Sequence, residues 1–185
     1  MVSPMALEFT LTVWDVLNAF IYILPAYIAN ASPVIFGGGT PLDFGKNFID
    51  GRRIFGDHKT IRGLLSGILF GTLTGIIVYF ITQIDARLLA LTLSDALMLG
   101  FLLSIGTHIG DLLGSFIKRR LNLKPGAPFV PMDQVGFLIF AILIAYPFYP
   151  LLNLAQLLLL LIVTPLVHIG SNVIAWLLKL KEHPW

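Results

Sequence analysis

Five polar residues lie at helical spacing within one apolar stretch of the chain. They are Ser104, His108, Asp111, Ser115 and Lys118, separated by 4, 3, 4 and 3 residues. In an α-helix this spacing places all five on one face. A polar face is costly against lipid, so we expect it to face the interior of a helix bundle or a wet cavity. A carboxylate there is well placed to hold a divalent cation. The alternative is a ladder of hydrogen bonds between helices.

A second carboxylate, Asp133, follows Pro131 at the start of another apolar stretch. Magnesium binds one or two protein carboxylates and completes its shell with water and substrate phosphates, so Asp111 and Asp133 together predict a Mg²⁺ site. An aspartate at a helix start also caps the helix by accepting hydrogen bonds from backbone N–H groups. The two roles are compatible, because one carboxylate oxygen can cap while the other binds the metal.

A polar, glycine-rich segment between the first two apolar stretches has the character of an anion site. It contains Gly37-Gly38-Gly39, Asp43, Asp50-Gly51-Arg52-Arg53 and Gly56-Asp57-His58-Lys59-Thr60-Ile61-Arg62-Gly63. Glycines let backbone N–H groups approach an anion closely, and the helix that follows would point its N-terminus at the segment. Lys59 and Arg62 would add charged donors, while the three acidic residues would pair with neighbouring bases. The alternative is a flexible basic loop that binds anionic lipid headgroups.

Composition indicates that the elements positioning these groups are membrane helices. The chain has 185 residues, of which 57% are hydrophobic and 12% charged, whereas soluble domains carry about 25% charged residues. Five apolar stretches have roughly the 20 residues that cross about 30 Å of hydrocarbon. The predicted spans are Leu11–Ile35, Ile61–Ile84, Leu93–Ile117, Asp133–Leu152 and Leu154–Leu178. We therefore predict an all-α integral membrane protein, a bundle of five transmembrane helices in which residues 1–185 form a single transmembrane catalytic domain.

The basic residues orient this bundle. Eleven of the twelve fall in segments 36–62 and 118–124 and in the C-terminal tail, and only Arg87 lies elsewhere. Lys and Arg are retained in cytoplasmic loops, so both long loops and the C-terminus are predicted to be cytoplasmic. The N-terminus, which has Glu8 and Asp15 but no Lys or Arg before the first span, is predicted to lie outside. The polar chemistry would then face the cytoplasm at the plasma membrane.

Several function classes are disfavoured. A formal net charge of +2 is too small to indicate a nucleic-acid partner, and the absence of cysteine excludes thiol chemistry. An ion-coupled transporter is the main alternative, because Asp111 and His108 could serve a proton or cation path. A transporter would usually show internal repeats and polar groups at mid-membrane depth. We interpret His168 and Asn172 as structural, and Lys181 only as a marker of orientation.

With these residues in view, the chain resembles the archaeal CDP-archaeol synthase family, CTP-dependent cytidylyltransferases that act on an ether-linked isoprenoid glycerol phosphate. The matching runs are Pro25–Asn30, the triple glycine with Pro41 and Asp43, Asp50–Arg53, Gly56–Gly63, Gly110–Arg120 and Asp133-Gln134. The run from Gly110 is also similar to the signature of the larger bacterial CDP-diacylglycerol synthases. Two positions depart from the family pattern: His58, where glycine is usual, and Gly136, where an acidic residue often follows Asp133.

The resemblance implies that a lipid phosphate attacks the α-phosphorus of CTP and that pyrophosphate leaves. It implies Mg²⁺ as cofactor, bound by Asp111 and Asp133, with Lys59 and Lys118 as further catalytic residues. The implied substrate-binding residues are Asn30, Gly38, Arg52, Asp57, Arg62, Ser115 and Arg119. The expected partners are CTP, the isoprenoid glycerol phosphate and membrane lipids, and the residues leave open whether identical chains assemble.

Overall fold

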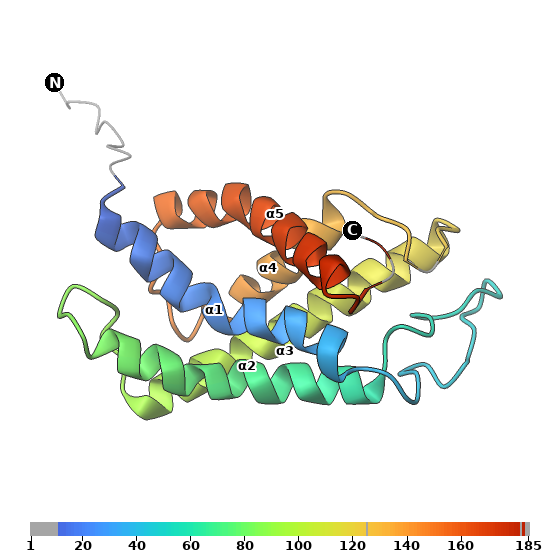
Figure 1. Ribbon diagram of the computed structural model, residues 1–185, viewed down its shortest axis with the longest axis horizontal. Coiled ribbons are helices and arrows are strands. Elements are labelled where there is room, and N and C mark those ends of the chain that lie inside the picture. Colours follow the sequence, from blue (N-terminus) through green and yellow to red (C-terminus); the bar gives the residue numbers. More distant parts are fainter. Residues whose placement is uncertain (1–10, 125, 182, 184–185) are drawn as a thin grey trace, which may run out of the picture.

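Five α-helices form the regular structure of residues 11–124, 126–181 and 183, which are described by a computed structural model (Figure 1). They are α1 (Val13–Phe36), α2 (Ile61–Thr82), α3 (Leu93–Arg120), α4 (Met132–Ala145) and α5 (Leu154–Leu177). Within the described residues, extended pairing is confined to two isolated β-bridges in the loop between α1 and α2. Residues 1–10, with Glu8 of the predicted outer stretch, lie outside the described part.

Four of the helices, α1, α2, α3 and α5, are long and apolar enough to cross a membrane. Their ends lie within three residues of the predicted spans. The all-helical prediction is therefore confirmed for the described part of the chain, and so is the position of these four helices.

The predicted length of the fourth span is wrong. Helix α4 has 14 residues and ends at Ala145 rather than at Leu152. Pro147 explains the early end, because its ring nitrogen has no hydrogen to donate to the preceding turn and its ring crowds that turn. The segment 146–153 nevertheless stays packed in the protein. Leu152 is buried, and the hydroxyl of Tyr22 donates to the carbonyl of Tyr149 at 3.1 Å.

Helices α1 and α3 pack closely against one glycine-lined face of α2. The glycines recur at every fourth residue: Gly63, Gly67, Gly71 and Gly75. A Cβ atom at Gly67 would overlap the ring of His108 on α3, and one at Gly75 would overlap the backbone of Ala96. Small residues at such spacing let helix backbones approach closely within a membrane.

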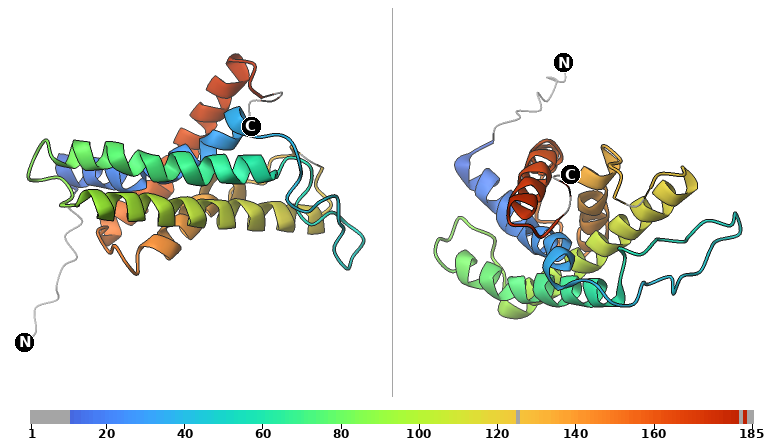
Figure 2. Two further views of the ribbon diagram at one scale, coloured as in Figure 1. Left: turned by 90° about the horizontal axis from the view of Figure 1, so that it is seen from below. Right: turned by 45° about the vertical axis from the view of Figure 1, so that its right-hand side comes forward.

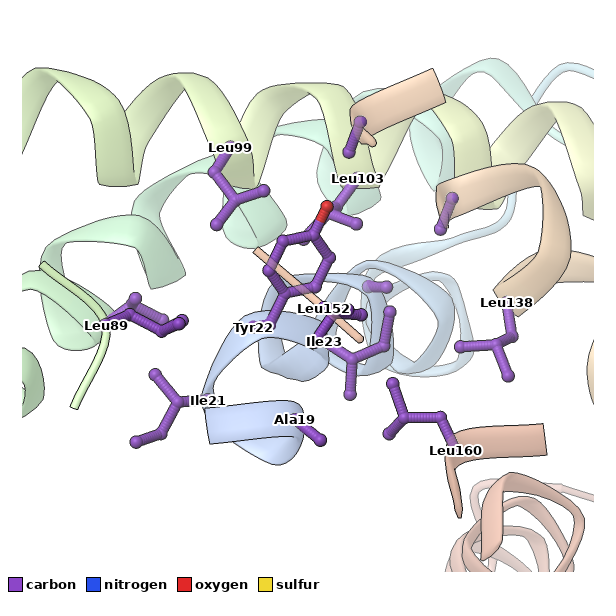
Figure 3. Close-up of a cluster of buried hydrophobic side chains, with 14 of the residues drawn as sticks. Ala19, Ile21, Tyr22, Ile23, Leu89, Leu99, Leu103, Leu138, Leu152 and Leu160 are labelled. Atoms are coloured by element: carbon purple, nitrogen blue, oxygen red, sulfur yellow. The ribbon is translucent and has the colours of Figure 1, made fainter. Parts of the chain in front are cut away.

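The apolar core lies where α1, α3, α4 and α5 meet. Figure 3 shows Tyr22 and Ile23 of α1 among leucines of α3, α4, α5 and the connecting segments, and both side chains are fully buried. The views in Figures 1 and 2 agree that the first loop (residues 37–60) and the second loop (residues 121–131) lie at the same end of the bundle. The polar segments singled out in the sequence are thus brought to one end, which we call the loop end.

Candidate functional site

The first element of the candidate site is an ion pair between Lys59 and Asp111. The Nζ atom of Lys59 donates to both carboxylate oxygens of Asp111, each at 2.6 Å. Backbone pairing fixes Lys59 on both sides, because its carbonyl accepts from the N–H of Leu42 and the next residue, Thr60, caps α2. The side chains of Lys59 and Asp111 are 27% and 33% exposed, so the pair remains accessible.

The second element is an ion pair between Lys118 and Asp133. The Nζ atom of Lys118 lies 2.8 Å from Oδ2 of Asp133. The same oxygen accepts a hydrogen bond from the backbone N–H of Phe129 at 2.9 Å. The predicted capping role of Asp133 is wrong: α4 begins at Met132, its N-cap is Pro131, and no side chain caps it. The carboxylate instead holds the end of the second loop against α3.

The two ion pairs belong to one electrostatic cluster. Asp111 and Lys118 lie two turns apart on α3, or about 10 Å along its axis. The charges of Asp111 and Asp133 both affect the ring of His168 in α5, and those of Lys59, Lys118 and Asp133 affect the ammonium group of Lys181 in the tail. Elements far apart in sequence therefore converge here, and the four residues predicted to be catalytic lie in one neighbourhood at the loop end.

The carboxylates of this cluster fit a metal ion that is held jointly with a phosphate ligand. Among the described residues, no three side chains of the types His, Cys, Asp and Glu gather into a metal-binding group. Magnesium needs only one or two carboxylates when phosphate and water supply the other oxygens. Asp111 and Asp133 are each about one-third exposed, so a ligand can reach them, and each carboxylate is contacted by one lysine ammonium group.

The polar face of α3 points into the protein, as predicted. Ser104 and His108 are buried, and the hydroxyl of Ser104 donates to the carbonyl of Gly100 at 2.6 Å. The ring of His108 lies against Gly67 of α2. Ser115, one turn beyond Asp111, is half-buried. The deeper half of this face therefore packs helices together, and its ionic part begins at Asp111.

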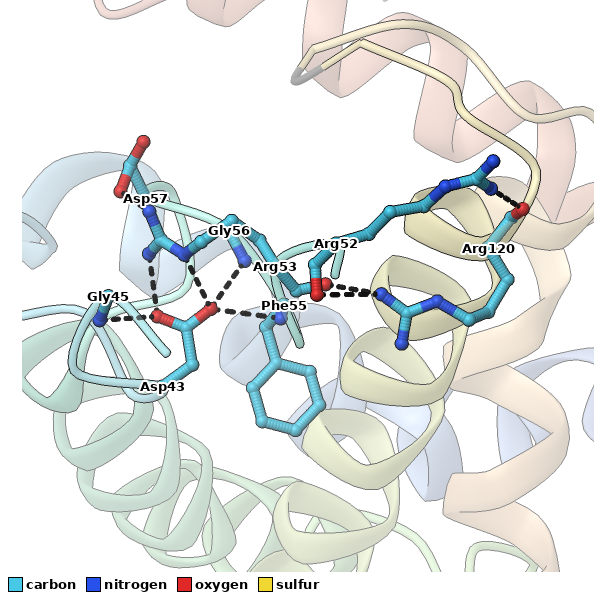
Figure 4. A network of polar contacts seen from close by, with 8 residues as sticks. All are labelled: Asp43, Gly45, Arg52, Arg53, Phe55, Gly56, Asp57 and Arg120. Atoms are coloured by element: carbon cyan, nitrogen blue, oxygen red, sulfur yellow. Dashed lines mark hydrogen bonds and ion pairs between the residues drawn. The ribbon is translucent and has the colours of Figure 1, made fainter. Parts of the chain in front are cut away.

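The first loop is organised around Asp43, whose side chain is fully buried. Its carboxylate accepts from the backbone N–H groups of Gly45, Phe55 and Gly56 at 2.9–3.1 Å. The guanidinium of Arg53 adds two donors, the closer at 2.6 Å (Figure 4). Burial alone would raise the pKa of Asp43, but Arg53 and these N–H groups lower the pKa well below its ordinary value. Asp43 is therefore a structural carboxylate that folds the loop around itself.

Arginines dock the folded loop onto the end of α3. The guanidinium of Arg52 donates to the carbonyl of Arg120, and that of Arg120 donates to the carbonyl of Arg53 at 2.6 Å. Arg120 also forms an ion pair with Asp50 at 2.7 Å. The expected pairing of the loop's acidic residues with bases is thus confirmed, since Asp57 also pairs with Arg53. Arg52, expected at the substrate, lies in this docking contact.

The other predicted substrate-binding residues lie in a groove beside α2, in α1, in the first loop and at the end of α3. Gly38 and Arg62 line a groove of about 520 Å³ beside α2, and the other lining residues include Leu65, Leu69 and Phe70. A groove lined by both polar and apolar groups suits an amphiphile. Asn30 is half-buried in α1, and Asp57 is exposed. Arg119 is buried and donates to the carbonyl of Lys124 at 3.2 Å.

Three polar residues at the α5 end of the site make contacts that the sequence did not predict. His168, Asn172 and Lys181 form a hydrogen-bonded chain, and charged groups of the two ion pairs are close enough to affect His168 and Lys181 electrostatically. One signal was present, because His168 and Asn172 are four residues apart in an apolar helix. Polar groups on one face of such a helix usually face a functional interior.

Comparison with known proteins shows the family of the chain. Residues 12–185 match the family model described as CarS-like, CDP-archaeol synthase. The chain belongs to this family. It is similar to the CDP-archaeol synthase of Pyrococcus furiosus, with 56% identity over 170 residues, which are 92% of this chain and 98% of the relative. It is also similar to the CDP-archaeol synthase of Methanococcus aeolicus, with 43% identity over 94% of this chain and 98% of the relative.

A solved structure adds a comparison of the fold. A protein described as an intramembrane enzyme for archaeal membrane lipids biosynthesis matches with a TM-score of 0.73 and 32% identity. The match covers 85% of this chain and 94% of that protein. The resemblance drawn from the sequence motifs to the CDP-archaeol synthase family is confirmed, and the transporter alternative finds no support.

Proposed function

We propose that the chain is a CDP-archaeol synthase, a membrane cytidylyltransferase that transfers CMP from CTP to an isoprenoid ether-lipid glycerol phosphate. The products are CDP-archaeol and pyrophosphate. The observation that carries the proposal is the pair of ionic contacts Lys59–Asp111 and Lys118–Asp133, which lie together at the polar end of an apolar helix bundle. Membership of the family supplies the nucleotide and the lipid.

The attacking group needs little activation by the protein. A phosphate monoester has its second pKa near 6, so much of the lipid phosphate is dianionic at neutral pH. An oxygen of that phosphate forms a bond to the α-phosphorus of CTP while the bond to the leaving pyrophosphate breaks. The main barrier is the repulsion and alignment of two anions. Lys59 and Lys118 would lower it by placing positive charge beside the phosphates.

Asp111 and Asp133 would hold Mg²⁺, which when bound neutralises phosphate charge and stabilises the leaving pyrophosphate. In this proposal Lys59 and Lys118 orient the two carboxylates in addition to binding phosphate oxygens. Both ammonium groups already lie within 2.8 Å of a carboxylate oxygen. Lysine has three donors on one flexible stem, so it can contact a carboxylate and a phosphate together.

The remaining predicted site residues would bind the substrates around this centre. Arg62 and Gly38, which line the groove beside α2, would contact a phosphate or headgroup. The apolar residues of the same groove would contact an isoprenoid chain. Arg119 and Ser115 lie on α3 beside Lys118 and would contact the nucleotide. Asn30, Arg52 and Asp57 would complete the binding surface from α1 and the first loop.

The proposed topology places five spans in the plasma membrane, with the N-terminus outside and the loop end in the cytoplasm. Residues 1–185 would form a single transmembrane catalytic domain, with α4 as a short fifth span. Support comes from the basic residues, of which only Arg87 lies outside the two loop segments and the tail. The absence of cysteine allows a clean test. Ile49→Cys in the first loop should react with an impermeant maleimide only from the cytoplasmic side, and Ile84→Cys only from outside. The reverse pattern would overturn the orientation.

Activity is tested with purified protein in lipid vesicles that contain the isoprenoid glycerol phosphate. With Mg²⁺ and CTP labelled at its α-phosphate, the label should enter the lipid, and one pyrophosphate should appear for each CDP-lipid formed. Reactions without lipid phosphate or with a chelator serve as controls. Folded protein that transfers no label under these conditions would contradict the proposal.

A further inference from the structure

The chain does not leave the bundle at the end of α5 but turns back toward the site. The N–H of Leu180 donates to the carbonyl of Ala175 at 2.9 Å, and the N–H of Lys179 donates to that of Trp176 at 2.9 Å. These two bonds form a Schellman turn, which needs a left-handed residue at the position of Lys179. Lys179 has a φ of 60°. Figure 2 shows the chain folding back from α5 toward α4.

This turn places Lys181 beside two polar residues of α5, Asn172 and His168. The Nζ atom of Lys181 donates to Oδ1 of Asn172 at 2.9 Å. The side-chain amide of Asn172 lies 3.2 Å from Nδ1 of His168. Lys181 is half-buried, whereas Lys179 is exposed. The turn therefore separates two lysines of the same tail into one that faces solvent and one that faces the protein.

Packing between α4 and α5 shows that Lys181 is held near the depth of Asp133. The rings of Phe137 and His168 lie 6.2 Å apart, centroid to centroid. Asp133 lies about one turn from Phe137 toward the loop end, and Asn172 lies about one turn from His168 in the same direction, because the two helices run in opposite senses. Asn172 and Asp133 are therefore at similar levels in the bundle.

The electrostatics of Lys181 agree with this position. Burial lowers the pKa of its ammonium group, Lys59 and Lys118 lower it further, and Asp133 opposes them. Three ammonium groups from the first loop, α3 and the tail thus act on one another. Asp111 and Asp133 offset part of the mutual repulsion of these ammonium groups, and a polyphosphate anion bound beside them would offset more of it. The contact with Asn172 holds the side chain of Lys181 in this position.

We propose that Lys181 contacts substrate, its ammonium group binding a phosphate oxygen as the third lysine of the site beside Lys59 and Lys118. Asn172 is its positioning residue. The inference rests on the proposed cytidylyltransferase activity and assigns a role in it to the C-terminal tail. Phosphate is present in both substrates, and the kinetic arms below distinguish the nucleotide from the lipid.

The test compares kcat and KM for both substrates in Lys181→Met and Lys179→Gly. Both variants remove one positive charge from the tail, and glycine keeps the left-handed turn. Loss of a hydrogen bond to a charged group should reduce kcat/KM of Lys181→Met by about 10- to 100-fold. Lys179→Gly should match the unmodified protein. A higher KM for CTP assigns the contact to the nucleotide, a higher KM for the lipid assigns it to the lipid phosphate, and a lower kcat alone assigns it to the reacting phosphates.

Chemical rescue separates a lost charge from a damaged fold. The chain has no cysteine of its own, so Lys181→Cys can be alkylated with 2-bromoethylamine at one position, which restores an ammonium group on a stem of nearly native length. Activity should fall in Lys181→Cys and recover on alkylation. Asn172→Leu should weaken activity less than Lys181→Met, and should add little to it in the double variant.

Two results would overturn the inference while leaving the proposed function intact. One is an active unmodified protein whose Lys181→Met variant is as active as Lys179→Gly. The other is Lys181→Cys that stays impaired after complete alkylation. An unmodified protein that forms no CDP-lipid would instead remove the proposed function itself.

Discussion

The carboxylates of Asp43, Asp111 and Asp133 all lie at the loop end of the molecule, but Asp43 differs from the other two in burial and in hydrogen bonding. Asp43 is fully buried and accepts hydrogen bonds from three backbone N–H groups and from Arg53. Asp111 and Asp133 are about one-third exposed, and each is held by one lysine ammonium group. A carboxylate whose lone pairs are all used by its own loop cannot bind a further cation. The difference separates a carboxylate that builds the loop from two that remain available to a ligand.

The largest expected effect comes from removing charge at the available carboxylates. Asp111→Asn and Asp133→Asn should each reduce turnover by about 10³-fold, because a bound metal ion contributes several kcal/mol of charge stabilisation. Each side chain keeps its size, so thermal unfolding in detergent should shift little. Full activity in either variant would remove that residue from the metal site.

The comparison predicts a different outcome for Asp43→Ala. Breaking a buried ion pair with hydrogen bonds costs about 3 kcal/mol or more, and here the cost falls on the local stability of the first loop. Hydrogen exchange at the backbone amides of Phe55 and Gly56 should accelerate strongly, while exchange in α5 stays as it was. Unchanged protection at Phe55 and Gly56 would show that the loop does not depend on Asp43.

A smaller effect is expected where the loop docks on α3. Arg120→Ala removes the ion pair with Asp50 and the contact with the ring of Phe116, 4.6 Å from the guanidinium carbon. We expect a loss of about 1–2 kcal/mol in loop docking and a several-fold decrease in kcat/KM. Arg87→Ala is the matched control, because Arg87 pairs with Asp85 and lies 3.7 Å above Trp14, in contacts outside the site. Equal activity losses in both variants would argue against a specific docking role.

The smallest effect is expected from pH. The folded loop lowers the pKa of Asp43 from its ordinary value of 3.8. The ionised form therefore stabilises the loop fully above that ordinary value, and the stabilisation is lost only as pH falls toward the lowered pKa. Protection factors at Phe55 and Gly56 should be the same at pH 8 and pH 5. They should decrease once the pH is below the ordinary pKa of Asp43. A decline already between pH 8 and pH 5 would mean that another group controls the loop.

Much of this arrangement could be predicted from local patterns. Apolar length alone placed the starts of α1, α2 and α3 within two residues, and in the structure Thr12, Thr60 and Thr92 cap these helices. The spacing of polar residues on α3 predicted a face turned to the interior, because helical periodicity is a local property. The predicted end of the fourth helix lies beyond the observed end of α4. Pro147 is visible in the sequence, but the residues around it are still apolar, and apolar length extended the predicted span past it.

The rest depended on contacts between segments far apart in the chain. The sequence predicted that Asp43 pairs with a base but not that its carboxylate is saturated, because the donors come from Arg53, Phe55 and Gly56, which are brought near only when the loop has folded. The position of Lys181 is still harder to predict from the sequence. It depends on a left-handed backbone conformation at Lys179, which favours glycine or asparagine. The end of α3 uses the same turn with Asn122 at that position.

The 14-residue length of α4 has a consequence for the bilayer itself. At 1.5 Å per residue the helix is about 21 Å long, well short of roughly 30 Å of hydrocarbon. In the proposed topology, in which α4 spans the membrane, a helix of this length imposes hydrophobic mismatch, which the surrounding leaflets relieve by thinning. Asp133 lies at the end of this helix where the leaflet would become thinner, so a lipid headgroup could reach the proposed metal ligands without leaving its own leaflet. Turnover should then decline when the protein is reconstituted in lipids of increasing chain length, and a rate that is independent of bilayer thickness would refute this.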